Sequence, residues 1–448
     1  MFKKNPILLG TFILTATGFL TRFIGFFFRM FLSHTFGEEQ VGLYQLIFPI
    51  YALCFSFTSA GIETAISRCV AHKISLGKNR DTISILYTGL SISLVLSIFT
   101  GFILQKNAAN FSIYILGDIR CESMLVAISY ALPFAAIHSS ICGYYFGLKE
   151  TKIPASSQLI EQIARVGTVF IIYHIALKHD SKIHILFAVL GIVIGEFCSA
   201  LYCIHFISRV KFQKRSAEKF KLFFHSSKEL LSLSIPLTAS RILLNILQSI
   251  ESISIPMCLQ TFGYSNTEAL SNYGVLTGMA LPCVLFPSAI TNSVSTMLLP
   301  TVAEIQAKKE YKYLKQLIAK VSFYCISLGF SCCFFFFFLS HWLGSVLFHS
   351  DLAGSYLKIL AWICPFLYLN ATLISITNGL GKANVSFFVN TIALTIRITG
   401  VLFFIPIIGM NGYLWGLLLS QCITCILTIS YLLFYFKKVF FHGHFTTT

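Results

Sequence analysis

Charged residues are scarce in this chain. Of its 448 residues only 11% are Asp, Glu, Lys or Arg, whereas 56% are hydrophobic and the mean hydropathy is +0.78. A soluble domain carries roughly 25% charged residues. The composition therefore excludes an ordinary soluble domain and predicts a surface that faces lipid.

Acidic residues are scarcer than basic ones, 17 against 33, so the net charge is +16. A basic chain can bind nucleic acid, but most Lys and Arg residues here lie in short segments between apolar stretches. We therefore expect no nucleic-acid partner. The phosphate-binding pattern GxxxxGK[ST] is also missing, which argues against ATP hydrolysis by this chain.

Signals for disulfides are missing as well, although the chain has 14 Cys. Most of them lie inside apolar stretches, as Cys54, Cys142 and Cys198 do, and a buried free Cys behaves as a small hydrophobic residue. Cys422 and Cys425 have CxxC spacing, but they fall in the middle of an apolar stretch. We expect no disulfide framework, no metal site and no bound cofactor.

Apolar stretches that can cross a membrane recur along the whole chain. A helix of about 20 residues spans a hydrocarbon core of about 30 Å. The first stretch is read as a transmembrane helix rather than a cleaved signal, because it contains Arg22 and Arg29 and no small-residue cleavage site. The sequence predicts an all-α membrane protein with about twelve spans, near residues 7–32, 41–67, 82–104, 121–147, 157–177, 183–207, 229–260, 272–300, 315–339, 354–378, 384–405 and 412–436.

The basic residues alternate between the predicted loops. If the N-terminus is cytoplasmic, the cytoplasmic segments hold 22 Lys and Arg residues, and the outer segments hold 4. The outer four are Lys106, Arg120, Lys178 and Lys182. Cytoplasmic loops of membrane proteins carry such an excess. The pattern predicts that both termini are cytoplasmic and supports the count of twelve.

The most basic loop falls near the middle of the chain. It predicts an N-terminal lobe of six spans at 1–210, a basic cytoplasmic linker at 211–228, a C-terminal lobe of six spans at 229–440, and a short cytoplasmic tail at 441–448. Because six is even, both lobes enter the membrane from the same side. A duplication would therefore be parallel, with a substrate site between lobes that rock against each other.

A shift of 232 residues brings the two halves into register. The stretch 133–165 then lies on 365–397, with identities at two loop or helix-bending positions and at an intramembrane Arg. The matching pairs are Pro133 and Pro365, Phe134 and Phe366, Gly147 and Gly379, Leu148 and Leu380, Ile160 and Ile392, and Arg165 and Arg397. Pro, loop Gly and intramembrane Arg do not match through apolar composition alone, so we expect two pseudo-symmetric lobes.

Several charged residues lie inside predicted spans. Such a charge costs at least about 2.5–3.5 kcal/mol on insertion scales, so it commonly faces a cavity. Arg22 and Arg29 share a helix face with Gly18, and Arg241 lies in the first span of the second half. Arg binds phosphate oxygens bidentately and stays charged when desolvated. We expect Arg22, Arg29 and Arg241 to converge on a phosphate or diphosphate site.

Other intramembrane charges allow more than one interpretation. Arg397 is a further candidate for substrate binding. Glu63 and Glu251 are either ion-coupling residues or salt-bridge partners of the arginines. Arg165 and Glu161 are four residues apart on a helix and can neutralise each other.

Glu196 lies beside Gly191 and Gly195, where a polar helix-packing contact is the simpler interpretation. Gly278, Pro282 and Pro287 punctuate the eighth span and predict a hinge, since Pro removes a backbone hydrogen bond and permits a bend. A bend that serves only packing remains the alternative.

Short motifs resemble those of the stage V sporulation protein B family, in the polysaccharide-exporter branch of the MOP superfamily, which also contains the lipid II flippases. They are TRFIGFFFR at 21–29, GLYQ at 42–45, AGI at 60–62, LTGMALP at 276–282, Pro287 and LP at 299–300. The resemblance covers nearly the whole chain and is strongest in spans 1–2 and 7–8.

The resemblance implies two six-helix lobes around a central cavity and alternating access. It implies a polyprenyl-diphosphate-linked saccharide as substrate, such as lipid II or a polysaccharide repeat unit, carried across a bacterial cytoplasmic membrane. In lipid II flippases, Arg residues in the first helices of both lobes are important. Arg22, Arg29 and Arg241 match those places, and Arg68 at the end of span two is a further candidate. Many relatives have fourteen spans, so the route of the lipid tail is open here.

The resemblance also suggests membrane lipids and cell-wall synthesis enzymes as partners. It leaves open the sugar, a sporulation role, and coupling to a Na+ or H+ gradient or to the membrane potential. The main alternative is a cation-coupled multidrug exporter of the related MATE branch, whose cavity should be rich in carboxylates. A membrane enzyme is disfavoured because the outer loops, including the one with His341, His349 and Asp351, are short.

Overall fold

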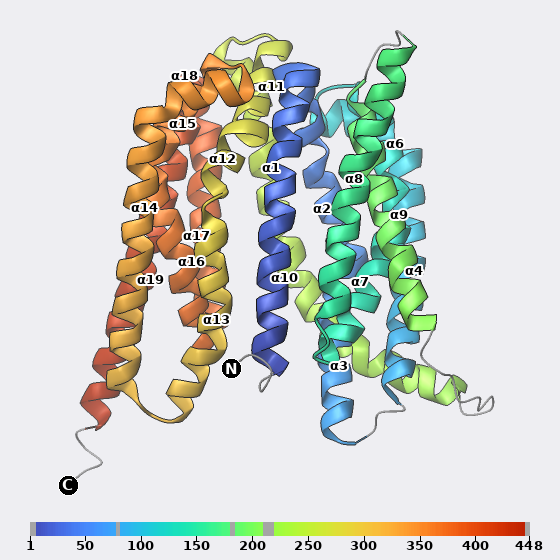
Figure 1. Cartoon of the computed structure of the whole chain (residues 1–448), viewed down its shortest axis with the longest axis vertical. Coiled ribbons are helices and arrows are strands. Elements are labelled where there is room, and N and C mark those ends of the chain that lie inside the picture. Colours follow the sequence, from blue (N-terminus) through green and yellow to red (C-terminus); the bar gives the residue numbers. More distant parts are fainter. Residues whose placement is uncertain (1–5, 78–80, 180–183, 209–218, 444–448) are drawn as a thin grey trace. The chain divides into compact units, whose positions relative to one another are not determined.

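The computed structural model describes residues 6–77, 81–179, 184–208 and 219–443 (Figure 1). Within these ranges every regular element is helical and no strand occurs. The predicted all-α fold class is confirmed. Part of the predicted linker, residues 211–218, and most of the predicted tail, 444–448, lie outside the described residues.

The described helices accommodate all twelve predicted spans. Nine helices are long and apolar enough to cross a membrane, and two bent helix pairs, 121–147 and 266–307, can each form one more crossing. The segment Phe12–Ser75 has 64 residues, about three times what one crossing needs, and it contains the first two predicted spans. Gly37 divides it, because its φ of 76° and ψ of 174° interrupt the helix in a region that favours glycine.

Compact packing groups the chain into two units. The N-terminal unit comprises Met1–Phe28 and Gln40–Ile253, and the C-terminal unit comprises Arg29–Glu39 and Ser254–Thr448. The units differ from the predicted lobes at two segments. The end of the first span, 29–39, packs with the C-terminal unit, and most of the seventh span packs with the N-terminal unit.

The first helix, α1 (Pro6–Leu46), contributes to both units. The remaining elements of the N-terminal unit are α2 (Phe48–Phe55), η2 (Ser56–Ala60), α3 (Gly61–Ser75), α4 (Asp81–Lys106), α5 (Ala108–Asn110), η3 (Phe111–Leu116), α6 (Cys121–Ser129), α7 (Ala131–Gly147), α8 (Lys152–Lys178), α9 (Leu186–Ser208) and the first part of α10 (Lys219–Phe262). Here η2 and η3 are π-helical turns. Helix α9 packs on both α7 and α8.

The C-terminal unit takes up the end of α10. Its other elements are α11 (Asn266–Gly274), η4 (Val275–Ala280), α12 (Leu281–Leu285), α13 (Ser288–Ala307), α14 (Tyr311–Phe348), α15 (Asp351–Leu360), η5 (Ala361–Ile363), α16 (Cys364–Gly379), α17 (Ala383–Thr399), η6 (Gly400–Phe404), α18 (Ile405–Ile408) and α19 (Met410–Gly443).

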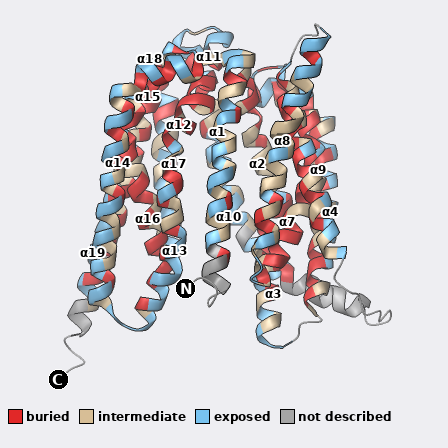
Figure 2. Cartoon of the chain, viewed as in Figure 1, coloured by how far each residue is buried: buried red, intermediate tan, exposed pale blue. Residues whose placement is uncertain are grey.

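Lipid-facing surface is visible in the burial pattern. Along α14, exposed and intermediate residues outnumber buried ones (Figure 2). Phe334 and Phe338 are 61% and 74% exposed, while Phe336 between them is 4% exposed. The Phe run therefore presents rings to both the lipid and the protein interior, as expected for a helix at the boundary of a membrane protein.

The two units repeat one packing contact at the predicted shift of 232. A methyl group on Gly147 would lie 2.8 Å from the carbonyl oxygen of Ser67, and it would also meet Val70. A methyl group on Gly379 would lie 2.8 Å from the carbonyl oxygen of Leu299 and would meet Val302. Both partners are displaced by 232, so the duplication holds in the packing of α7 on α3 and of α16 on α13.

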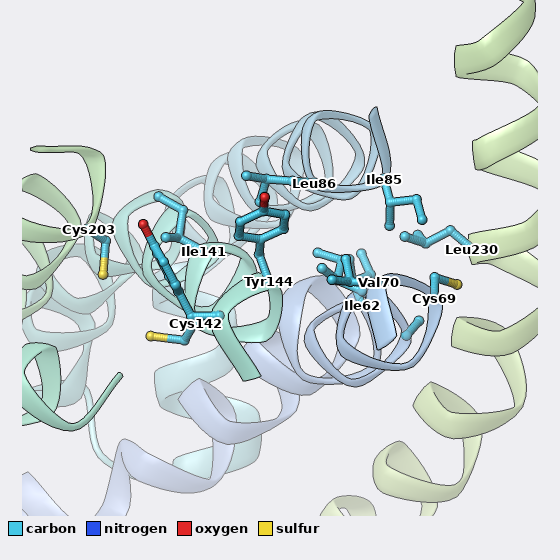
Figure 3. Packing of buried hydrophobic residues seen from close by; sticks show 13 residues of the cluster. Ile62, Cys69, Val70, Ile85, Leu86, Ile141, Cys142, Tyr144, Cys203 and Leu230 are labelled. Atoms are coloured by element: carbon cyan, nitrogen blue, oxygen red, sulfur yellow. The ribbon is translucent and has the colours of Figure 1, made fainter. Parts of the chain in front are cut away.

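The core of the N-terminal unit surrounds this contact. Ile62, Val70, Ile141 and Tyr144 of α3 and α7 pack together with residues from α4, α9 and α10 (Figure 3). A second cluster, which includes Leu298, Val302, Leu373 and Ile376, occupies the corresponding place in the C-terminal unit. Each unit thus has its own apolar core.

Candidate functional site

Arg241 is held in place by the N-terminal unit. Its Nη1 donates to the carbonyl oxygen of Ala60 at 3.0 Å, and its Nη2 donates to Oγ1 of Thr64 at 3.1 Å. Both partners lie where η2 passes into α3, and π-helical turns of this kind are frequent at functional sites. Arg241 is nonetheless exposed, so an oriented guanidinium reaches the surface of this unit.

Helix α10 packs along α2 and α3 through a row of small and polar residues. Asn245 donates to Oγ of Ser56, and Ser249 donates to the carbonyl oxygen of Pro49 at 3.3 Å. At the other end of the row Thr238 meets Gly61 so closely that a Cβ on this glycine would overlap its hydroxyl. These contacts fix the register of α10 and with it the position of Arg241.

The predicted convergence of three arginines remains a prediction. Arg22 and Arg241 belong to the N-terminal unit and are both exposed, whereas Arg29, also exposed, belongs to the C-terminal unit. On the Arg22 face a Cβ added to Gly18 would meet no described atom within 4 Å. A Cβ added to Gly25 on the same face would lie 3.4 Å from Nε2 of Gln162, so the face of α1 is open at Gly18 and covered at Gly25.

The other predicted residues are spread over both units. Glu63 is half-buried in the first turn of α3 and interacts electrostatically with Arg241 and His138. Arg68 is exposed on the same helix, and Glu251 is buried in α10. Arg397 is half-buried in α17 of the C-terminal unit. Of this group, Glu63 is next in the chain to Thr64, which accepts a hydrogen bond from Arg241.

The predicted hinge coincides with a bend. The segments Asn266–Leu285 and Ser288–Ala307 are inclined by 60° across a short break, which contains Pro287. Gly278 lies in the π-helical turn η4, and Pro282 is buried in α12. The geometry supports a bend at this point, whereas motion about it stays a prediction.

Sequence reasoning missed a cluster of polar side chains inside the N-terminal unit. Nδ1 of His138 on α7 lies 3.2 Å from Oε2 of Glu196 on α9, and its Nε2 lies 3.0 Å from Oγ of Ser157 on α8. Tyr51 of α2 donates to the other carboxylate oxygen of Glu196 at 3.4 Å. The side chains of His138 and Glu196 are only 12% and 11% exposed.

An ion pair completes this cluster. Arg165 and Glu161 on α8 form the expected pair over one helical turn. Gly191 and Gly195 let α9 approach α8, because a Cβ on Gly195 would lie 2.8 Å from the carbonyl oxygen of Glu161. The expected glycine-mediated packing is therefore present, but Glu196 beside it also binds His138 and Tyr51.

One signal for this cluster was available in the sequence. His138 is a titratable residue inside the fourth span, as unusual there as the arginines. Its partners lie 19 and 58 residues away, so no local spacing reveals them. We name the group His138, Ser157, Glu161, Arg165 and Glu196 the α7–α9 polar cluster.

The chain is similar in sequence to known proteins over most of its length. A family model described as polysaccharide biosynthesis protein matches residues 7–306. Stage V sporulation protein B of Bacillus subtilis (strain 168) is 30% identical over 415 residues, which cover 91% of this chain and 80% of that protein. Lipid II flippase MurJ of the same organism is 23% identical over 344 residues, which cover 70% and 61%.

Solved structures agree on the fold. A structure of the lipid II flippase MurJ in an inward closed conformation matches with a TM-score of 0.69 and 17% identity, over 96% of this chain and 90% of that chain. An inward-facing multidrug resistance MATE family transporter of the MOP superfamily matches with a TM-score of 0.68 and 13% identity, over 94% and 95%.

The two structures match equally well, so the fold alone does not separate a flippase from a drug exporter. The expectation of a transporter rather than an enzyme is confirmed. The sequence resemblance is also confirmed, because the family model spans about two thirds of the chain and a relative in the same branch reaches 30% identity over most of it. The chain belongs to the polysaccharide biosynthesis protein family.

Proposed function

We propose that this protein moves a polyprenyl-diphosphate-linked saccharide across the bacterial cytoplasmic membrane by alternating access. Arg22 and Arg241 of the N-terminal unit bind the diphosphate. Arg29, Arg68 and Arg397 are secondary contacts for the same anionic substrate. Enzymes of cell-wall synthesis are the partners that supply or consume such a lipid.

The oriented guanidinium of Arg241 carries the proposal. Two of its N–H groups are engaged by Ala60 and Thr64, and a guanidinium has five N–H donors in a fixed plane. A preoriented fork of this kind suits bidentate binding of phosphate oxygens. Lipid surroundings strengthen the attraction, since charges interact more strongly where the dielectric constant is low.

A multidrug exporter of the MATE type fits this geometry less well. Its cationic substrates need accessible carboxylates. In the described part of the N-terminal unit, Glu196 and Glu251 are buried, and Glu161 is paired with Arg165. Among the side chains of α1 and α10 whose burial is described, the exposed charged ones are arginines. Relatives named for sporulation and for lipid II flipping support the same choice.

The test is lipid binding by native mass spectrometry on the purified protein. Lipid II, undecaprenyl diphosphate and a cationic dye are offered to the wild type and to Arg22→Ala/Arg241→Ala. We expect selective retention of the diphosphate lipids by the wild type. Each charged hydrogen bond contributes about 1.5–3 kcal/mol, so the double variant should lose retention by at least about tenfold.

Arg120→Ala is the matched control. This Arg pairs with Asp118 next to the N-terminus of α6 and lies on a predicted outer loop. The control loses one positive charge but should retain the diphosphate lipids. Retention of the dye alone, with no response to either arginine, would replace the flippase proposal by the drug-exporter alternative.

A further inference from the structure

We propose that His138 and Glu196 form a one-proton site, and that its loading controls how tightly Arg241 holds an anionic substrate. Proton binding by this pair stands on the geometry of the α7–α9 polar cluster alone. The link to Arg241 rests on the proposed function.

The hydrogen bonds around His138 allow two protonation states. The Ser157 hydroxyl lies 2.8 Å from the carbonyl oxygen of Pro154 and 3.0 Å from Nε2 of His138, so its single hydrogen can be donated to either. When it is donated to Pro154, Nε2 of His138 donates to the Ser157 oxygen, and a second hydrogen lies between Nδ1 and Glu196. In that state the pair holds one proton more than a neutral imidazole beside a carboxylate.

Release of this proton needs one small movement. If the Ser157 hydroxyl turns from the Pro154 carbonyl towards Nε2, the ring nitrogen accepts a hydrogen bond and its own proton can leave. Nδ1 keeps its hydrogen and its bond to Glu196. The step breaks one N–H bond, releases one H+ and leaves a neutral imidazole, so atoms and charge balance.

Charge neutrality favours the loaded state. Arg165 and Glu161 cancel each other, so the cluster is neutral with the proton and carries one negative charge without it. Its side chains are between 11% and 21% exposed, and an uncompensated charge is costly in such surroundings. The site is therefore stabilised by one bound cation, here a proton. Because Glu161 is paired with Arg165, the proton binds to His138 and Glu196.

The titratable groups around the pair come from every helix packed against it. Tyr44 and Tyr51 from α1 and α2 interact electrostatically with Arg165, and Glu63 of α3 interacts with His138. Two further titratable groups are the thiols of Cys142 on α7 and Cys203 on α9, whose sulfur atoms lie within 4.8 Å of a His138 ring nitrogen. These two Cys lie at one end of the core in Figure 3.

Glu63 links the proton site to Arg241. Its neighbour in the chain, Thr64, accepts a hydrogen bond from Arg241, and α3 packs closely on α7 at Glu63, because a Cβ on Gly143 would lie 2.5 Å from the Glu63 carbonyl oxygen. When His138 loses its positive charge, the Glu63 carboxylate is attracted by Arg241 alone. Arg241 then attracts an anion less, so the loaded site should favour substrate binding and the unloaded site should favour release.

The first test reads the protonation state directly. Nitrogen-15 NMR of histidine-labelled protein in lipid nanodiscs distinguishes imidazolium from neutral imidazole, and the His138 signal is assigned by its loss in His138→Gln. We expect imidazolium at low pH that becomes neutral as the pH rises. Glu196→Gln should move this transition to lower pH. His174→Gln, on the exposed face of α8, should remove a different signal only.

The second test measures retention of undecaprenyl diphosphate at one pH below and one pH above this transition. The wild type should bind several-fold more tightly at the lower pH, within the range of about 5–150-fold that site coupling produces. His138→Gln should lose this pH dependence. Retention that is strong but equal at both pH values would overturn the link to Arg241.

The two proposals fail in different ways. A His138 ring that is neutral throughout, or a signal that responds to sodium and not to pH, would overturn the proton site even if diphosphate lipids bind. Absence of diphosphate binding at every pH would overturn the proposed function, and the NMR titration would still decide the proton site. Should His138→Gln fail to fold, His138→Asn, which introduces the residue found at the equivalent position 370, provides the assignment.

Discussion

The two units place different chemistry at equivalent positions of one repeated scaffold. Gly147 and Gly379 make the same close contact 232 residues apart. The same shift pairs His138 with Asn370, and Glu63 with Ser295. In the C-terminal unit Asn370 donates to Oε1 of Gln421 at 2.8 Å, so an uncharged amide takes the place of His138, and the same shift puts Thr428 at the position of Glu196.

The hydroxyls of the C-terminal unit continue this difference. Oγ of Ser295 lies 3.3 Å from Oγ1 of Thr372, and the Ser375 hydroxyl donates to the carbonyl oxygen of Ser295. Amides and hydroxyls are uncharged over the whole physiological pH range, whereas His changes its charge within that range. The comparison teaches that the packing contact and the intramembrane arginine (Arg165 and Arg397) were duplicated without the ionisable His138–Glu196 pair, and that pH sensitivity is expected in the N-terminal unit.

The largest effect should follow from breaking the Arg165–Glu161 pair. Glu161→Gln leaves a buried guanidinium without its carboxylate, and such a change costs about 3–5 kcal/mol. Thermal unfolding in detergent should show a large drop in the midpoint. The double variant Glu161→Gln/Arg165→Met should recover much of the loss, since no lone charge remains. Equal midpoints for wild type and Glu161→Gln would mean that the pair does not stabilise the unit.

A smaller effect should follow from filling the repeated glycine contact. Gly147→Ala and Gly379→Ala each bring a methyl group to about the same distance from a backbone carbonyl, and overpacking costs about 1–3 kcal/mol. Both variants should lower the unfolding midpoint by similar amounts. Gly18→Ala is the matched control, because its added Cβ meets open space. A large effect at one repeat and none at the other would break the proposed equivalence.

The smallest effect on stability should come from converting the ionisable pair into amides. His138→Asn/Glu196→Gln gives the N-terminal unit the chemistry of Asn370 and Gln421. Neutral hydrogen bonds replace charged ones, so the unfolding midpoint should change by about 1 kcal/mol or less in free energy. The pH dependence of diphosphate binding should disappear at the same time. If it persists, the titrating group lies elsewhere.

Much of the fold could be predicted from the sequence, because the membrane restricts the possibilities. Each span must be helical and about 20 residues long, and the excess of Lys and Arg assigns the loops to sides. The described helices contain most of each predicted span. The break at Gly37 inside the first helical segment was not predicted, since it depends on backbone angles.

The candidate site was predictable only where charge alone singles out a residue. Arg22 and Arg241 are conspicuous because charges inside a span are costly, and the structure leaves both exposed. The bonds that orient Arg241 come from Ala60 and Thr64, which lie 181 and 177 residues away. No periodicity in the sequence could have indicated them.

By itself the sequence determined the fold class, the spans and the duplication, because these follow from hydrophobic length, loop charge and a repeat that can be read along one dimension. Only the tertiary structure decided that Glu196 meets His138 across 58 residues and that Ser157 sits at the other ring nitrogen. Hydrogen bonds act over about 3 Å. Which side chains come that close is set by how α7, α8 and α9 pack, and by the glycines that let them approach.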